Sequence, residues 1–205
     1  MTQSERKNAG LIYCDIGDEE IAKLQIAGKK IMEKFNATSA DEFELREKLL
    51  HEMLGACGKN CYIEPPFHGN WGGKNLFFGD GVYANFNLTV VDDVEIIVGN
   101  NVLFAPNCTL TTANHPICPE LRRKGYQYTK KIIIKDNVWL GSNVVVLPGV
   151  TIGENSVIGA GSVVSRDIPA NVVAMGVPCR VYREITDDDK KYFDGGKLID
   201  YENLT

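Results

Sequence analysis

Three histidines are the side chains of this sequence best suited to accept a proton near neutral pH: His51, His68 and His115. His51 falls in a segment with helical spacing, and His68 lies in a glycine-rich stretch. His115 instead follows Asn114 at the start of a long polar segment. Because loops held on a rigid scaffold often carry reactive groups, His115 is the candidate general base.

Cysteine spacing gives little support for a metal centre. Cys57 and Cys61 form a C-x3-C motif that His51 or His68 could join, but no second pair follows, unlike the usual zinc arrangements. We therefore expect no metal. The six cysteines are scattered along the chain, and we predict that they are reduced thiols.

Composition limits the classes of partner. The chain has 205 residues, 44% of them hydrophobic, and a formal net charge of −5. Nucleic-acid binding depends on Lys and Arg that neutralise phosphates, so we predict no nucleic-acid partner, although a local basic site for a phosphorylated small molecule is allowed. The N-terminus lacks an apolar core and apolar runs are short, so we expect neither a signal peptide nor a membrane span. We therefore predict a cytoplasmic protein.

The scaffold that must position these residues is indicated by a six-residue repeat. Eleven repeat units open with an apolar residue and carry Gly, Asn or Asp three positions later, the residue types that tolerate left-handed backbone. The opening residues are Phe78, Ala84, Val90, Val98, Phe104, Ile134, Leu140, Val146, Ile152, Ile158 and Val164. The turn residues are Gly81, Asn87, Asp93, Asn101, Asn107, Asn137, Asn143, Gly149, Asn155, Gly161 and Asp167.

Each repeat unit predicts a short strand followed by a corner, because the position after the turn residue is again apolar or small. Three units would make one triangular coil, and stacked coils would bury an apolar face that one coil cannot bury alone. Residues 132–168 show no helical period, which argues against an open sheet with helices between its strands. The sequence therefore predicts a mainly β protein, a parallel β-helix.

Segments without the repeat flank or interrupt this solenoid. We predict an N-terminal helical segment over 1–56, the β-helix over 57–185 and a C-terminal tail over 186–205. Residues 112–131 are a polar insertion that starts just before His115. An insertion of this length in a regular solenoid predicts a protruding loop.

Two helices are expected before the solenoid. Apolar residues at three- and four-residue spacing predict one helix from Ile21 to Phe35. Ser39 followed by Glu42 predicts a capping box for a second helix, which would run to about Gly55. We expect both helices to cover the open first coil, because an uncovered strand edge invites association.

Several motifs resemble the galactoside and maltose O-acetyltransferases, hexapeptide-repeat enzymes with a left-handed β-helix. The resemblance covers nearly the whole chain. The motifs are Tyr83-Ala84-Asn85-Phe86-Asn87-Leu88-Thr89, Val91-Asp92-Asp93, Asn114-His115-Pro116, the segment from Gly153 to Ser162, and Gly176-Val177-Pro178-Cys179-Arg180.

The resemblance implies a homotrimer with active sites between subunits and acetyl-CoA along the edge of the β-helix. His115 matches the family's general base, which would take a proton from a sugar hydroxyl as its oxygen attacks the thioester. Asn85 matches a residue that stabilises the transition state, since an amide N–H can donate to an oxyanion. Asn85 could otherwise be only a turn partner.

The resemblance also implies the positions that contact each substrate. The acceptor positions are Asp15, Asn70, Tyr83, Asn85, Asp93 and Gln127. Asp93 is also a turn residue of the repeat, and Asn70 and Gln127 replace the Ser and Met of the galactoside pattern, so the accepted sugar stays open. The positions that would hold acetyl-CoA are Trp139, Ser142, Ala160, Ser165, Arg166, Arg180 and Arg183. The three arginines would supply positive charge for its phosphates.

The expected activity is acetyl transfer from acetyl-CoA to a hydroxyl of a sugar or glycoside. Two alternatives stay open: a different acceptor, such as an antibiotic, a serine hydroxyl or an amino sugar, and a non-catalytic binding protein built from the same repeat. A γ-type carbonic anhydrase is disfavoured, because its zinc site draws three histidines from the coils and no histidine here lies in the eleven units.

Overall fold

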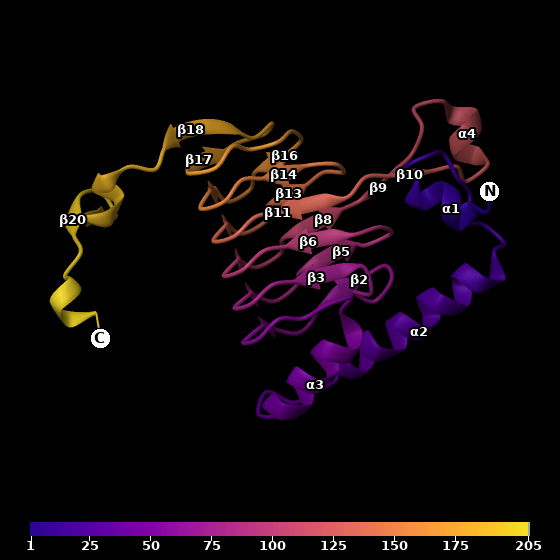
Figure 1. The fold of residues 1–205 in the computed structure, drawn as a ribbon, viewed down its shortest axis with the longest axis horizontal. Helices are drawn as coiled ribbons and strands as arrows, with labels where there is room; N and C mark the ends of the chain where they lie inside the picture. The colour runs from indigo at the N-terminus through magenta and orange to yellow at the C-terminus, as the bar shows by residue number, and fades with distance from the viewer. Residues whose placement is uncertain (205) are drawn as a thin grey trace.

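Three sheets form the body of the molecule, a triangular parallel β-helix drawn in Figure 1. The structure is a computed structural model that describes residues 1–204. The seven-stranded sheet contains β1 (Tyr62–Ile63), β4 (Tyr83–Ala84), β7 (Leu103–Phe104), β12 (Trp139–Leu140), β15 (Val157–Ile158), β17 (Val172–Met175) and β18 (Arg180–Glu184). The five-stranded sheet contains β2 (His68–Gly69), β5 (Thr89–Val91), β8 (Thr109–Thr111), β13 (Val145–Val146) and β16 (Val163–Val164). The four-stranded sheet contains β3 (Leu76–Phe78), β6 (Ile96–Val98), β11 (Ile132–Ile134) and β14 (Thr151–Ile152).

The core of the β-helix confirms the repeat. All eleven opening residues are buried, between 0% and 4% exposed. Nine of the eleven turn residues, the asparagines and glycines, have φ between +54° and +88°. The remaining two, Asp93 and Asp167, do not adopt positive φ, so the predicted turn geometry is wrong at these two positions. Asparagine and glycine turn the corner through backbone conformation, whereas the two aspartates use their carboxylates.

Two of the three corners of the β-helix matter for the site. Edge I is the corner that follows the seven-stranded sheet and comprises residues 64–67, 85–88, 105–108, 141–144 and 159–162. Edge II is the corner that follows the five-stranded sheet and comprises residues 70–75, 92–95, 112–131, 147–150 and 165–167. The five-stranded sheet separates the two edges within one chain.

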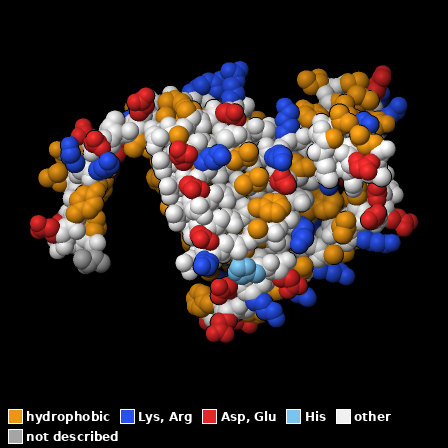
Figure 2. All heavy atoms as spheres, in the orientation of Figure 1, with side chains coloured by type: hydrophobic (Ala, Val, Ile, Leu, Met, Phe, Trp, Pro, Cys, Tyr) orange, Lys and Arg blue, Asp and Glu red, His pale blue; other side chains and the backbone are white. Residues whose placement is uncertain are grey.

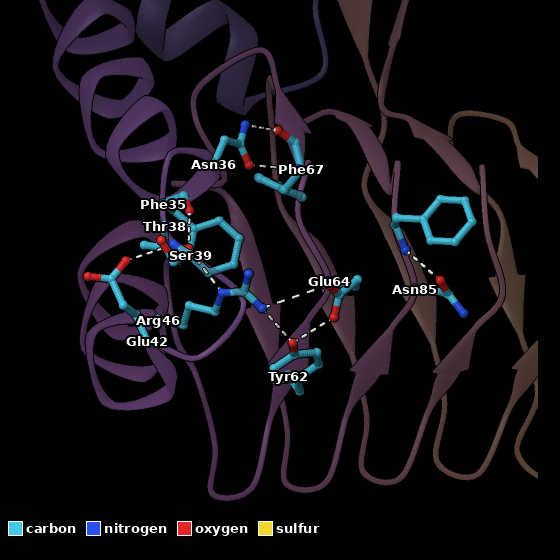
Figure 3. Close-up of polar contacts among 11 residues, drawn as sticks. Phe35, Asn36, Thr38, Ser39, Glu42, Arg46, Tyr62, Glu64, Phe67 and Asn85 are labelled. Carbon is cyan, nitrogen blue, oxygen red and sulfur yellow. Dashed lines mark hydrogen bonds and ion pairs between the residues drawn. The ribbon is translucent and has the colours of Figure 1, made fainter.

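Helices α2 (Glu19–Asn36) and α3 (Phe43–Met53) cover the first coil, as expected. The side-chain amide of Asn36 donates to the Phe67 carbonyl and accepts from the Phe67 N–H, both at 2.8 Å, as a neighbouring strand would (Figure 3). The buried Arg46 donates to Tyr62 Oη at 2.7 Å, and Tyr62 donates to Glu64 at 2.6 Å. Asn36 therefore satisfies the backbone of the open first coil at Phe67, and the Arg46 side chain ties α3 to that coil.

The capping box predicted for the second helix forms only in part. The Ser39 N–H donates to the Glu42 carboxylate at 2.7 Å, but α3 begins at Phe43 with Glu42 as its N-cap and has no side-chain cap. A turn closed by the Glu42 N–H and the Ser39 carbonyl takes the place of the first helical turn. A third helix, α1 (Gln3–Asn8), has no counterpart in the expectations; Thr2 and Glu5 form its capping box.

The insertion after β8 forms a hairpin that protrudes from edge II (Figure 1). Strands β9 (Ala113–Asn114) and β10 (Tyr128–Thr129) pair antiparallel, and α4 (Pro119–Arg123) lies at the tip. The loop is therefore ordered by its own hydrogen bonds. It lies beside α1, because the Thr129 hydroxyl donates to the Lys7 carbonyl at 3.1 Å.

The last part of the chain leaves the β-helix. β18 returns antiparallel along β17 and completes the seven-stranded sheet. Beyond it, η1 (Asp187–Lys190), the hairpin β19 (Tyr192–Phe193) and β20 (Lys197–Leu198), and η2 (Tyr201–Asn203) form a separate lobe that Figure 2 shows beside the solenoid. Over residues 1–204, no helix has both the length and the apolar character needed to cross a membrane.

Candidate active site

Asp93 is the centre of a polar cluster on edge II. It follows β5, its side chain is buried, and its Oδ1 accepts hydrogen bonds from Asn70 Nδ2 and Trp71 Nε1, both at 2.7 Å. Within residues 1–204, Oδ2 makes no hydrogen bond. Two donors thus orient the carboxylate, and one of its oxygens is left free to accept.

Asp92 holds the segment that carries those donors. Its Oδ1 accepts from the Trp71 N–H at 2.7 Å, and its Oδ2 accepts from the N–H groups of Gly73 at 3.1 Å and Asn75 at 3.4 Å. Burial raises the pKa of Asp92 to about 6, against the opposing effect of these backbone hydrogen bonds. Sequence reasoning missed Asp92 and Trp71; the signal for Asp92 was the two extra residues between the units that open at Val90 and Val98.

The N-terminal arm, residues 1–18, brings two predicted acceptor residues to the same edge. Tyr13 and Gln127 form an antiparallel bridge, with both backbone hydrogen bonds at 2.9 Å. Gln127 Nε2 then donates to Asp15 Oδ2 at 3.0 Å. Residues 112 positions apart in sequence are therefore in contact, and they lie at the base of the protruding loop.

His115 is exposed directly after β9, and its ring has one hydrogen-bond partner among residues 1–204. Its Nδ1 lies 2.9 Å from the carbonyl oxygen of Tyr126. Because a carbonyl oxygen only accepts, Nδ1 carries the proton of the neutral ring. The Nε2 lone pair is therefore the basic position, and the Tyr126 carbonyl would also stabilise the ring after Nε2 takes a proton.

Tyr83 and Asn85 lie in a different part of the β-helix. Tyr83 is exposed in β4 and stacks on Tyr62, with ring centroids 6.1 Å apart. Asn85 begins edge I; its Oδ1 accepts from the Phe86 N–H at 2.8 Å, and Figure 3 shows its amide nitrogen directed away from that contact. Asn85 therefore does make a local turn contact, yet its N–H groups remain available to donate.

The predicted cofactor residues also divide between the edges. Trp139 pairs with Leu103, which pairs with Tyr83, so the tryptophan lies in the same outward column of the seven-stranded sheet. Ser142 and Ala160 follow on successive coils of edge I, where the Gly161 N–H donates to the Ser142 carbonyl at 2.8 Å. Ser165 and Arg166 instead lie exposed on edge II, after β16.

The two remaining arginines lie on β18, and both side chains bond within the chain. Arg180 donates to the Cys179 carbonyl at 2.7 Å. Arg183 forms a bidentate pair with Asp189, with both N···O distances 2.7 Å, and this pairing holds the pKa of Asp189 at about 2. Arg183 is therefore neutralised by a carboxylate in this structure, whereas Arg166 on edge II makes no ion pair among the described residues.

The structure thus brings the site residues into two groups, one for each edge. The edge II group is Asp15, Asn70, Asp93, His115, Gln127, Ser165 and Arg166. The edge I group, with the sheet before it, is Tyr83, Asn85, Trp139, Ser142 and Ala160. A cleft of about 680 Å³ is lined by residues that include Lys7, Asp93 and Thr129 but neither Tyr83 nor Asn85.

The cysteine pair has an ordinary thiol environment. Cys61 Sγ donates to the Gly79 carbonyl at 3.0 Å. Burial, together with the neighbouring Cys61, raises the pKa of Cys57 to about 12, which keeps its proton at neutral pH. No group of three or more His, Cys, Asp or Glu with metal-binding geometry occurs in residues 1–204.

Comparison with known proteins shows which family the chain matches. Residues 131–166 match the bacterial transferase hexapeptide model of six repeats, and residues 6–58 match the maltose acetyltransferase hexapeptide capping motif. The galactoside O-acetyltransferase of Lactococcus lactis is 56% identical over 91% of this chain and 90% of its own length. This chain belongs to the galactoside and maltose O-acetyltransferase family.

Other members of the O-acetyltransferase family agree in sequence and fold. The galactoside O-acetyltransferase of Escherichia coli is 50% identical and covers 94% of each chain. A galactoside acetyltransferase solved in complex with coenzyme A superimposes with a TM-score of 0.94 at 49% identity, covering 97% of this chain and 98% of that one. A maltose O-acetyltransferase from Clostridium difficile gives a TM-score of 0.88 at 42% identity, covering 91% and 98%. These matches establish the left-handed β-helix and an acetyl-CoA-dependent acetyltransferase.

Proposed function

We propose that this O-acetyltransferase transfers acetyl from acetyl-CoA directly to a hydroxyl of a sugar or glycoside, with His115 as general base. The observation that carries the role of His115 is the hydrogen bond between Nδ1 and the Tyr126 carbonyl, because it leaves the Nε2 lone pair free. Relatives named galactoside O-acetyltransferase, and a solved relative that holds coenzyme A, support the acceptor class and the donor.

The reaction proceeds in one displacement, without a covalent acyl-enzyme. His115 Nε2 takes the proton of the acceptor hydroxyl as its oxygen forms a bond with the thioester carbonyl carbon. The amide N–H of Asn85 donates to the oxyanion of the tetrahedral intermediate. The carbon–sulfur bond then breaks, and the imidazolium returns its proton to the thiolate of CoA. Acceptor ester and free thiol are the products.

The active protein is a homotrimer in which edge I of one copy faces edge II of the next. The division of the site residues between the two edges supports this, since one chain does not join His115 to Asn85. An outward apolar column in the seven-stranded sheet supports it further: Tyr83, Leu103 and Trp139 are 39%, 45% and 50% exposed. Closing such columns against a second copy buries apolar surface.

Each active site takes residues from two copies. Asp15, Asn70, Asp93 and Gln127 of one copy contact the acceptor together with Tyr83 and Asn85 of the next. Ser165 and Arg166 of one copy meet Trp139, Ser142 and Ala160 of the next along the acetyl-CoA chain, and Arg180 and Arg183 bind its phosphates. We also infer a cytoplasmic location, which the six free cysteines support.

The experiment that tests this function measures free CoA thiol with a panel of galactosides, glucosides, maltose and amino sugars. His115→Ala and Asn85→Ala are prepared as separate proteins and as a co-expressed mixture. Each single variant should fall about 100-fold below wild type or lower. The mixture should recover about a quarter of wild-type activity, because one site in four then pairs an intact Asn85 with an intact His115.

The outcomes separate the parts of the proposal. A mixture no more active than its components would place both residues in one chain and overturn the shared site. Thiol release with amino sugars alone would replace the O-acetyl acceptor by an amine. Absence of thiol release with every acceptor would favour a non-catalytic binding protein.

A further inference from the structure

The Tyr13 hydroxyl has a chemical environment that the fold does not explain. Tyr13 is fully buried, and its backbone is fixed by the two hydrogen bonds to Gln127. Its Oη is the one buried side-chain nitrogen or oxygen of residues 1–204 that lacks a hydrogen-bond partner. A buried hydroxyl without a partner destabilises the fold, so its persistence needs a compensating role.

Lys7 is a second such donor on the same arm. It belongs to α1 and is 7% exposed, and its Nζ lies 3.9 Å from the centroid of the Trp71 ring. No carboxylate of the described chain lies within ion-pair distance of Nζ. Its ammonium therefore rests on an aromatic face and keeps N–H groups free to donate.

Both donors lie beside the acceptor group: Lys7 lines the same cleft as Asp93, and Tyr13 pairs with Gln127, whose side chain bonds to Asp15. Burial raises the pKa of Tyr13, and the charges of Asp93 and Asp15 raise it further. Burial lowers the pKa of Lys7, while Asp93 and Asp15 act in the opposite sense. The phenol and the ammonium thus lie in the field of the same two carboxylates, and Asp93 keeps Oδ2 unpaired.

This set of groups matches a sugar hydroxyl. A hydroxyl donates one hydrogen bond and accepts others, so it can donate to Asp93 Oδ2 while it accepts from Lys7 Nζ. Tyr13 Oη is fully buried, so the acceptor reaches this oxygen only when the N-terminal arm shifts to expose it. We propose that Tyr13 and Lys7 bind the acceptor and determine its specificity, and that the acceptor presents neighbouring hydroxyls to Asp93. This inference rests on the proposed sugar-acceptor function. It assigns a binding role to the N-terminal arm beyond the contact of Asp15.

Tyr13→Phe tests the proposal sharply, because it removes an oxygen that bonds to nothing in the chain. We expect the KM for the best glycoside to rise about tenfold, with kcat and the KM for acetyl-CoA within about twofold of wild type. The Tm should not fall. A KM that stays at the wild-type value overturns the role of Tyr13, whether the Tm rises through loss of an orphan hydroxyl or falls through loss of a bound water.

Lys7→Met keeps an unbranched stem over Trp71 and removes the charge. We expect about a tenfold rise in the acceptor KM, while Lys30→Met on the exposed side of α2 leaves the KM unchanged. The mono-deoxy analogues of the glycoside provide the cross-check. One analogue should bind weakly to wild type but lose nothing further with Tyr13→Phe, since the same hydrogen bond is already absent.

Failure of this proposal differs from failure of the proposed function. A wild-type protein that acetylates glycosides, with Tyr13→Phe and Lys7→Met equal to it in acceptor KM, overturns only the role of the arm. A wild-type protein that acetylates no glycoside overturns the acceptor class and this inference with it.

Discussion

Edge I and edge II are corners of the same β-helix, but they solve the turn differently. On edge I the turn residues Asn87, Asn107, Asn143 and Gly161 all adopt positive φ. On edge II, Gly149 does so too, but Asp93 and Asp167 do not, and the insertion that carries His115 interrupts the coil. Edge I repeats one backbone solution, whereas edge II departs from it where proton transfer and acceptor contacts are proposed.

The difference shows what each edge requires from folding. Edge I buries small or apolar side chains, and its backbone N–H and C=O groups form hydrogen bonds between successive coils. Edge II buries Asp92 and Asp93, and it must supply backbone and side-chain donors to hold them. Buried carboxylates cost folding free energy unless they are hydrogen-bonded, so a regular repeat would not keep them without a functional reason.

The largest expected effect separates activity from stability on edge II. His115→Ala should lower kcat/KM by about 100-fold or more, since it removes the base. The Tm should stay near wild type, because the side chain is exposed. His51→Ala, on the exposed face of α3, is the matched control and should retain activity. Near-normal thiol release by His115→Ala would show that His115 on edge II is not the general base.

The next effect concerns the core that both edges share. Leu140→Ala should lower the free energy of unfolding by about 2–5 kcal/mol, because Leu140 is fully buried and a cavity remains. Urea unfolding measures it. Ile97→Ala, at an outward position 39% exposed, should cost less than about 1 kcal/mol. Equal losses for the two variants would contradict the inward and outward alternation of the coil.

A smaller effect tests the turn chemistry of edge I. Asn107 has a φ of +62°, and its Oδ1 accepts from Asn87 Nδ2 at 2.9 Å. Asn107→Ala should be about 1–2 kcal/mol less stable than Asn107→Gly, because alanine is strained in left-handed backbone and glycine is not. Both variants lose the side-chain contact, so their difference isolates the backbone term. Thermal unfolding that ranks glycine below alanine would reject this reading of the corner.

The smallest effect sharpens the contrast through pH. The pKa of Asp92 is raised to about 6, so protonation of Asp92 stabilises the folded state. This contribution to the free energy of unfolding is fully present below the ordinary pKa of an aspartate and is lost as the pH rises through about 6. Between pH 7 and pH 5, wild type should gain about 1 kcal/mol of unfolding free energy relative to Asp92→Asn, which does not titrate. Urea unfolding at both pH values tests this. Parallel pH dependence of the two proteins would show that Asp92 does not titrate in this range.

Sequence patterns predicted the scaffold well because the repeat is local. An opening residue such as Leu140 specifies a buried strand within its own six-residue unit. An asparagine such as Asn107 specifies a turn through its own backbone conformation, without contacts to distant residues. Asp93 shows where local reading fails. Its spacing predicts a turn residue, but contacts with Asn70 and Trp71 from the preceding coil decide its conformation.

The site was predicted only in part. His115 was found because it follows the end of a regular coil, and the family resemblance supplied the other expected positions. Lys7 and Tyr13 gave no signal, because the first eighteen residues carry no repeat and their partners come from distant coils and the loop. The only sequence feature that pointed to Asp92 was the two extra residues in the repeat unit that opens at Val90.

By itself the sequence determined a mainly β solenoid, its buried and outward positions, and the loop that bears His115, because periodicity and turn residues act over six residues at a time. The tertiary structure decided that the site residues fall on two separate edges, that the ring of His115 leaves Nε2 without a protein partner among the described residues, and that the N-terminal arm pairs with the loop at Gln127 and places Lys7 over Trp71. These features arise from contacts between segments as distant as Asp15 and Gln127, which no local pattern encodes.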